Sequence, residues 1–248
     1  MLNLSLGVTS PAVLGGAPAT GGDPLFSEVV FLVNWDNEVV GEISSTTELS
    51  SNASTIALEY DAQFIDSVAD PFGGSEVVLD LDGGLDAINV PYRANLRLTG
   101  AFTIEMFVRF DSSITGILAG MYDASGTDRN WIMYVSGGNI AWGVGKTGGT
   151  VEETKTFTWG TGATNTWYHI AVTRDDSDDV RAFIDGVQLG AAQNQPLDGD
   201  GSDIDVKFGK FGFSGAELNG KFGPIRITNG SARYTEAFTV PETFFPTS

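Results

Sequence analysis

Residues 167–190 read WYHIAVTRDDSDDVRAFIDGVQLG, and this stretch decides the fold. Every second residue from Tyr168 to Val172 is apolar, which is the period of a β-strand with one face in a core. After an acidic run, a second alternating segment leads into Asp185-Gly186, a strong signal for a two-residue hairpin turn. The stretch therefore predicts a strand, an acidic loop and a hairpin.

His169, the only histidine of the chain, lies close in sequence to the acidic run at residues 175–179. A histidine beside carboxylates is a candidate for catalysis or for metal binding. The alternation, however, places His169 inside the predicted strand, and no Gly-x-Ser-x-Gly motif occurs in the chain. We interpret His169 as a structural strand histidine and the acidic run as a solvated turn.

The same succession of predicted strands and turns extends over the rest of the chain from Ser27 onward. FTIEMFVRF at residues 102–110 alternates over nine positions, and NWIMYVSGGNIAWGVG at residues 130–145 places a Gly-Gly-Asn turn between two strand-like runs. No segment has a sustained apolar period of about 3.6 residues. Strands separated by turns at a spacing of about 8–12 residues predict an all-β, two-sheet antiparallel sandwich.

Two parts of different composition make up the chain. Residues 1–26 form a Gly- and Pro-rich N-terminal arm, in which no side chain is charged through Gly22, and residues 27–248 form the sandwich domain. The arm lacks the positively charged start of a signal peptide. Because such a segment has little reason to order alone, we expect it to anchor on another subunit or on the domain.

Charge and composition exclude several classes of function. The chain has 13 Lys and Arg against 32 Asp and Glu, a formal net charge of −19, and no cysteine. A field of this sign repels nucleic acid and anionic membrane surfaces. No apolar run reaches the length of about 18 residues that spans a bilayer. We expect no nucleic-acid partner, no membrane insertion and no disulfide.

Four segments, in order, resemble the laminin G-like domain of the concanavalin A-like lectin/glucanase superfamily, in the version found in tailed-phage virion proteins. They are DPLFSEVVFLVNWD (23–36), FTIEMFVRF (102–110), TWYHIAVTRDDSDDVRAFIDGVQLG (166–190) and LNGKFGPIRITNGSARYTEAFTVPETFFP (218–246). Two departures stand out: Phe107 replaces the usual Trp, and Gly223-Pro224 replace the usual acidic residues.

The resemblance implies a concanavalin A-like jelly roll on the surface of a virion. The protein would be a non-enzymatic capsid decoration or a tail or fibre component, arranged as a homo-oligomer or symmetric array. Its arm would contact other virion proteins, and its rim loops would adhere to host-surface glycans. Two alternatives stay open: a Ca²⁺-dependent carbohydrate-binding lectin module and a glycoside hydrolase.

A glycoside hydrolase needs two carboxylates that flank the scissile bond. Glucanases of the superfamily that the chain resembles place these two carboxylates on one strand in a Glu-x-Asp-x-Glu pattern, because alternate residues of a strand share a face. The chain has no such run, and Glu105 is followed at alternate positions by Phe107 and Arg109. We expect no enzymatic activity.

Two Asp-rich runs, DLDGGLD and DGDGSDID, offer the oxygen ligands that Ca²⁺ prefers. Both lack the full pattern and the terminal Glu of an EF-hand loop. The candidate calcium ligands are Asp198, Asp200 and Asp203 in the second run, with Asp80, Asp82 and Asp86 in the first. The alternative is that both runs are solvated loops of an acidic chain.

The segment YDASGTDRNW, residues 122–131, combines an aromatic ring with hydrogen-bonding side chains around an expected loop. Such a combination suits a glycan, whose rings stack on aromatic side chains and whose hydroxyls need polar partners. The candidate glycan-binding residues are Tyr122, Asp123, Asp128, Arg129 and Asn130. Most tryptophans of a β-sandwich belong to its core, so the Trp residues are not assigned to this site.

Overall fold

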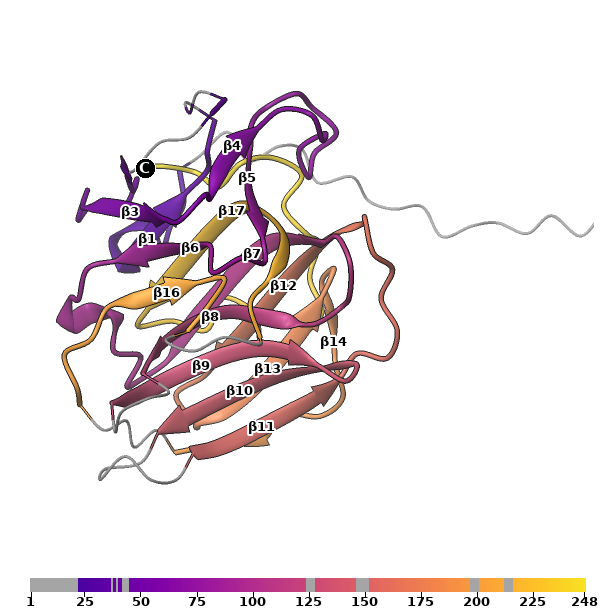
Figure 1. Cartoon of the computed structure of the whole chain (residues 1–248). Helices are drawn as coiled ribbons and strands as arrows, with labels where there is room; N and C mark the ends of the chain where they lie inside the picture. The colour runs from indigo at the N-terminus through magenta and orange to yellow at the C-terminus, as the bar shows by residue number, and fades with distance from the viewer. Residues whose placement is uncertain are drawn as a thin grey trace, which may run out of the picture.

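The computed structural model describes residues 22–36, 38, 40–41, 45–123, 128–145, 152–196, 201–211 and 216–248. They form two antiparallel β-sheets that pack face to face, which confirms the predicted all-β sandwich (Figure 1). The described residues contain no α-helix, only the short 3-10 helices η1 (Phe26–Glu28) and η2 (Ala94–Leu96). None of their helices is long and apolar enough to cross a membrane. Residues 1–21 of the predicted arm lie outside the described residues.

The first sheet has nine strands, here named sheet A. Its order is β14 (Val187–Gln188), β13 (Asp179–Ile184), β12 (Trp167–Arg174), β7 (Phe102–Phe110), β17 (Asn219–Asn229), β5 (Val78–Asp82) and β4 (Gln63–Ile65). In addition, β1 (Val29–Val33) pairs with β17, and β15 (Gln193–Asn194) pairs with β13.

The second sheet, sheet B, has eight strands. Its order is β11 (Glu152–Thr158), β10 (Asn139–Gly145), β9 (Arg129–Ser136), β8 (Gly116–Tyr122), β16 (Val206–Phe208), β6 (Ala87–Val90), β3 (Thr55–Glu59) and β2 (Ser45–Thr47). Segments far apart in the chain are therefore neighbours in both sheets, as in the pairing of β16 with β6 and β8.

The fold-deciding stretch has the predicted structure. Strand β12 pairs with β7, with Ile170 opposite Met106. Asp185 and Gly186 both adopt positive φ, 49° and 76°, which is the backbone of a type I′ hairpin turn. The acidic run forms the β12–β13 loop, where the Asp175 carboxylate lies 2.7 Å from the Arg181 guanidinium. Local turn chemistry and alternation were sufficient to predict this part of the fold.

Strand β7 is buried on both faces, whereas the alternation predicts burial of one. One face of β7 contributes to the interior of the sandwich. The alternate residues, which include Glu105 and Phe107, point to the outer face and are also buried. The cause is the C-terminal segment, residues 231–248, which lies over the outer face of sheet A. Phe107 packs 6.1 Å from Phe245, between ring centroids, and Glu105 accepts a hydrogen bond from Tyr234.

The main core fills the space between the two sheets. Trp131 and Trp142 stack with ring centroids 5.6 Å apart, and Phe102 lies 4.8 Å from Trp142. Such aromatic pairs stabilise a core by about 0.5–1.5 kcal/mol beyond the burial of their surface. The tryptophans at positions 131 and 142 are core residues.

The Gly-rich turn at residues 83–86 links the two sheets, because β5 belongs to sheet A and β6 to sheet B. Gly83 adopts a φ of 86°, a backbone conformation that residues other than glycine adopt less readily. This crossing places the acidic residues of the turn at an edge of the sandwich.

Candidate functional site

The two loops that carry the predicted glycan and calcium residues meet at one end of the sandwich. Asn130 donates a hydrogen bond from Nδ2 to the Ser202 carbonyl at 2.8 Å. Ser202 Oγ donates to Asp128 Oδ1 at 3.0 Å. Asn130 is buried, so its amide holds the second loop in place. The structure thus brings together, through residues 72 positions apart, two loops whose candidate residues the sequence analysis assigned to separate sites.

Tyr122 and Arg129 flank the first of these loops. The Arg129 guanidinium lies 5.3 Å from the centroid of the Tyr122 ring, in cation–π geometry. Asp123 donates its backbone N–H to the Asp128 carbonyl at 2.7 Å, which closes the loop at its base. The ring of Tyr122 also lies 5.2 Å from Phe211.

Asp203 is the described member of the predicted calcium site, and Asp198 and Asp200 lie outside the described residues. The Asp203 carboxylate forms an ion pair with Arg97. Arg97 in turn lies over the ring of Tyr92, 5.2 Å from its centroid. A metal ion at Asp203 would therefore compete with a guanidinium for the same carboxylate.

Beside the loops, the outer face of sheet B has an apolar groove with a volume of about 520 Å³. Ile117, Ile132 and Phe211 form its buried floor, and the half-exposed Tyr122 and Tyr134 border it. A groove of this size with aromatic walls has the dimensions of a small-ligand site. Of the predicted glycan residues, Tyr122 is the one that lines it.

Sequence reasoning missed the rest of this groove, although a signal was present. In β9, Trp131 and Met133 are buried in the main core. The residues that alternate with them, Ile132 and Tyr134, belong to the apolar cluster on the outer face. A strand that is apolar on both faces indicates burial or binding on its second face. Phe211 joins them only through the tertiary structure.

Asp61, Asp82 and Asp86 form a group of carboxylates whose oxygens lie within 4.8 Å of one another. Hard oxygen ligands of this kind could hold a divalent cation. Burial, together with the neighbouring charges of Asp61 and Asp82, raises the pKa of Asp86 to about 6, and a hydrogen bond from the Asp82 backbone opposes this rise. Asp80, a predicted candidate, lies instead 2.7 Å from the Lys221 ammonium.

His169 belongs to a buried ionic network under the C-terminal segment. Its Nε2 lies 3.1 Å from Glu105 Oε2, and Arg226 lies 2.7 Å from Glu105 Oε1. Burial alone would raise the pKa of Glu105, but Arg226, His169 and Arg233 lower it to about 2. The carboxylate is therefore ionised and shared among its neighbours, in agreement with a structural histidine.

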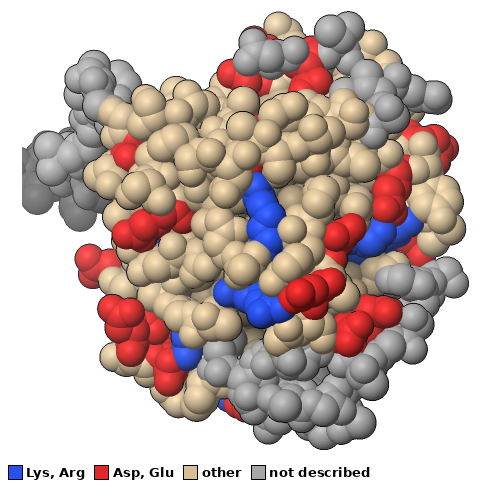
Figure 2. Space-filling view, turned by 90° about the vertical axis from the view of Figure 1, so that its left-hand side faces the viewer, with Lys and Arg blue, Asp and Glu red and all other residues tan. Residues whose placement is uncertain are grey.

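Acidic side chains shape the molecular surface. Figure 2 shows one face, on which Lys and Arg side chains lie near the centre with acidic side chains beside them, and further Asp and Glu side chains lie toward the margins. The formal net charge of −19 gives the protein a negative electrostatic field, which repels anions.

Two antiparallel sheets, an aromatic groove and polar loops at one end define a lectin-like binding domain. Residues 82–236, more than half of the chain, match the family Laminin_G_3 of the concanavalin A-like lectin/glucanases superfamily. The chain belongs to this family. It has no significant match among curated proteins.

Solved structures with the same fold include clostridial binding domains. The binding domain of botulinum neurotoxin serotype D has a TM-score of 0.63 at 12% identity, over 84% of this chain and 50% of that one. The binding domain of Paraclostridial Mosquitocidal Protein 1 has a TM-score of 0.60 at 17% identity, over 88% and 51%. The serotype D domain in complex with N-acetylneuraminic acid has a TM-score of 0.60 at 12% identity, over 84% and 49%. The chain spans about half the length of these proteins, and the likeness is one of fold.

Proposed function

We propose that this protein is a non-enzymatic component of a tailed-phage virion, a capsid decoration or a tail or fibre part, that adheres to host-surface glycans. The observation that carries the glycan-binding part is the groove on sheet B. Tyr122 and Tyr134 border the groove, and aromatic side chains of this kind suit the stacking of a sugar ring, while Asp128 and Ser202 provide polar groups at the loop end of β8 and β9.

The fold comparison supports a sugar ligand, because a neighbour with this fold was solved in complex with N-acetylneuraminic acid. Here the acidic surface favours a neutral glycan over an anionic one, since like charges repel. The proposed ligand class is therefore a neutral host-surface oligosaccharide.

The residues around the groove favour binding over hydrolysis. Among its described lining residues, Glu217 alone is acidic. Glycoside hydrolysis uses two carboxylates that flank the scissile bond, about 5–9 Å apart. A glycoside hydrolase would release product from a polysaccharide, and such release by the purified protein would contradict the non-enzymatic part of the proposal.

The virion part of the proposal is supported by the four motifs that resemble those of tailed-phage proteins. In this proposal, residues 1–26 attach the protein to other virion proteins, and the domain repeats as a homo-oligomer or symmetric array on the particle surface. Asp23 donates its backbone N–H to the Ser248 carbonyl at 2.7 Å, so the end of the arm is held beside the C-terminal segment. Deletion of residues 1–21 should abolish incorporation into particles and leave the melting temperature unchanged. Incorporation without these residues would contradict this anchoring.

Calcium enters the proposal through Asp198, Asp200 and Asp203. A Ca²⁺ ion there would be held by their carboxylate oxygens, which suit a hard cation. Isothermal titration with CaCl₂ on the wild-type protein and on Asp200→Asn tests this. Equal heats from both proteins would remove calcium from the proposal.

The glycan-binding proposal is tested on an array of neutral and sialylated glycans, with and without Ca²⁺. Tyr134→Ala should reduce binding at least tenfold, because it removes a stacking face without opening the core. Tyr60→Ala is the matched control, since Tyr60 is an exposed tyrosine that does not line the groove. A blank array, or equal binding by Tyr134→Ala and Tyr60→Ala, would overturn the assignment.

A further inference from the structure

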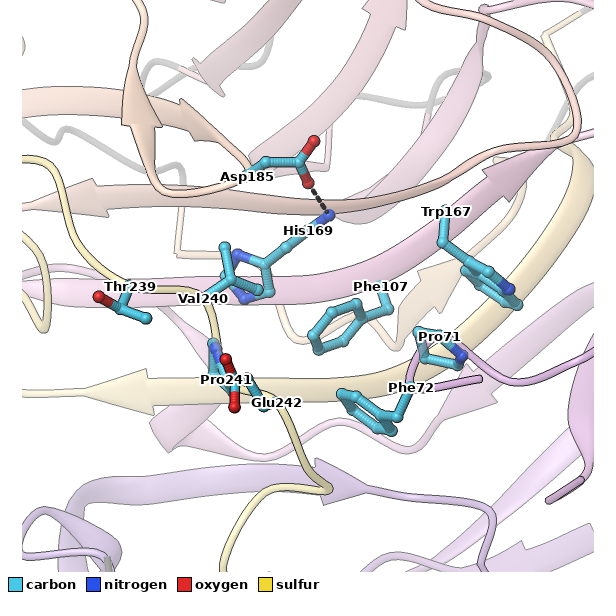
Figure 3. Close-up of a pocket in the computed structure, with 10 residues that line it drawn as sticks. All are labelled: Pro71, Phe72, Phe107, Trp167, His169, Asp185, Thr239, Val240, Pro241 and Glu242. Atoms are coloured by element: carbon cyan, nitrogen blue, oxygen red, sulfur yellow. Dashed lines mark hydrogen bonds between the residues drawn. The ribbon is translucent and has the colours of Figure 1, made fainter. Parts of the chain in front are cut away.

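A second cavity, of about 460 Å³, lies on the opposite side of the sandwich, between sheet A and the C-terminal segment (Figure 3). Phe72, Phe107 and Trp167 contribute aromatic rings to its wall. The Trp167 ring is fixed, because its Nε1 donates a hydrogen bond to the Ala69 carbonyl at 2.9 Å. The three rings come from three different segments of the chain, so the enclosure is a product of the tertiary structure.

The two charged carboxylate residues that line this cavity are Asp185 and Glu242, so its lining is acidic. None of its described lining residues is Lys or Arg. One oxygen of Asp185 accepts the backbone N–H of His169 at 2.9 Å (dashed in Figure 3). The exposed Glu242 comes from the C-terminal segment. These carboxylates attract a cation and repel an anion.

His169 contributes its imidazole ring to the lining. Its ring lies next to Val240 and Phe107 in Figure 3, with the Phe107 centroid 4.9 Å away. Because Glu105 is an ionised acceptor, the imidazole Nε2 carries the proton that lies between them. Nδ1 is buried and has no hydrogen-bond partner among the described residues.

We propose that this cavity binds a small organic ammonium ion. Aromatic faces attract cations through their ring quadrupole, and quaternary ammonium groups are bound in aromatic cages. The volume falls within the range of about 300–1,000 Å³ for small-ligand sites. The site and the proposed glycan groove lie on opposite sheets, so this inference stands independently of the proposed function.

The experiment titrates the full chain, labelled with ¹⁵N, with three small molecules, two of which have the same shape and differ in charge. Choline is a quaternary ammonium, ethanolamine is a primary ammonium, and 3,3-dimethyl-1-butanol is the neutral isostere of choline. We expect at least one of the two cations to shift the Trp167 indole resonance and to bind about tenfold or more tightly than the alcohol, because charge is what the site recognises. A shift of the Trp167 indole resonance by ethanolamine and not by choline identifies a primary ammonium as the ligand.

Two variants locate the binding. Glu242→Gln should weaken cation binding severalfold, while Glu236→Gln, which changes another exposed carboxylate of the same segment, should not. Phe72→Leu keeps an apolar wall but removes a ring, and it should reduce the preference for choline over its neutral isostere. Binding of the alcohol as tight as that of choline, or the absence of any shift at Trp167 with either cation, would overturn the proposal.

Discussion

Asp23 and Arg233, 210 residues apart in sequence, form a two-point ion pair. Nη1 of Arg233 lies 3.0 Å from Oδ1 of Asp23, and Nη2 lies 2.7 Å from Oδ2. Arg226 adds a contact of 2.9 Å to the same carboxylate. Asp23, which belongs to the predicted arm of residues 1–26, is buried and ties the start of the described chain to its C-terminal segment.

Removal of this carboxylate should destabilise the domain. Asp23→Asn leaves Arg226 and Arg233 partly uncompensated in a buried setting, and we expect a loss of about 2–4 kcal/mol in the free energy of unfolding. Urea denaturation at pH 7 measures it. Asp176→Asn, in the exposed acidic loop, is the control and should change stability by less than about 0.5 kcal/mol. Equal stability of the two variants would show that the ion pair contributes nothing.

The low pKa of Glu105 predicts acid sensitivity. This carboxyl has a pKa of about 2 in the folded state and about 4.3 in the unfolded chain. It therefore stabilises the fold at pH values above the unfolded pKa. This contribution, on the order of 3 kcal/mol, is lost as the pH falls from about 4.5 toward 2. Denaturation curves between pH 6 and pH 3 should show the loss. Glu105→Gln should be less stable at pH 6 and flatter with pH, while Glu76→Gln, at an exposed site, should retain the wild-type slope.

Asp86 should show the opposite dependence on pH. Its pKa of about 6 lies above its unfolded value, so its contribution to stability is complete below about pH 3.9 and decreases as the pH rises through 6. The ¹³C shift of its carboxyl carbon, followed from pH 4 to pH 8, measures the pKa directly. Asp82→Asn removes a neighbouring negative charge and should lower that pKa. A midpoint near 4 in the wild-type protein would contradict the arrangement of Asp61, Asp82 and Asp86.

Gly120 controls the shape of the groove on sheet B. A Cβ at this position would lie 2.3 Å from the Phe211 ring and 3.2 Å from the Trp131 carbonyl. Gly120→Ala should therefore displace Phe211, reduce stability by about 1–3 kcal/mol and weaken binding of any glycan held in the groove. Thermal denaturation and the glycan array measure both effects. Gly100→Ala is the control, because its Cβ would meet nothing within 4 Å.

Several local features of the fold could be predicted from sequence because their causes are local. The alternation in β7 and β12 reflects the period of a strand, and the Asp185-Gly186 turn reflects backbone preference. The covering of the outer face of β7 could not be predicted from this pattern, because alternation records that a side chain is apolar and not which segment packs on it.

The residue types of the candidate site could be predicted from sequence, but the contacts between them could not. Asp128 and Asn130 could be chosen for their chemistry, yet their hydrogen bonds to Ser202 depend on two loops that meet at one end of the sandwich. The predicted carboxylate set does not contain Asp61, because Asp61 lies in a different turn, between β3 and β4, that only the fold brings to Asp82 and Asp86. Residue types are local information, whereas distances between loops follow from the strand order.

The sequence by itself determined the class of fold, the hairpin after β12 and the acidic character of the surface. Only the tertiary structure decided that Asp23 meets Arg233, that Tyr122 meets Phe211 and that His169 lies beside an aromatic cavity. The physical reason is that strand periodicity and turn preference act over a few residues, while these contacts arise from the pairing of strands far apart in the chain and from a C-terminal segment folded back over sheet A.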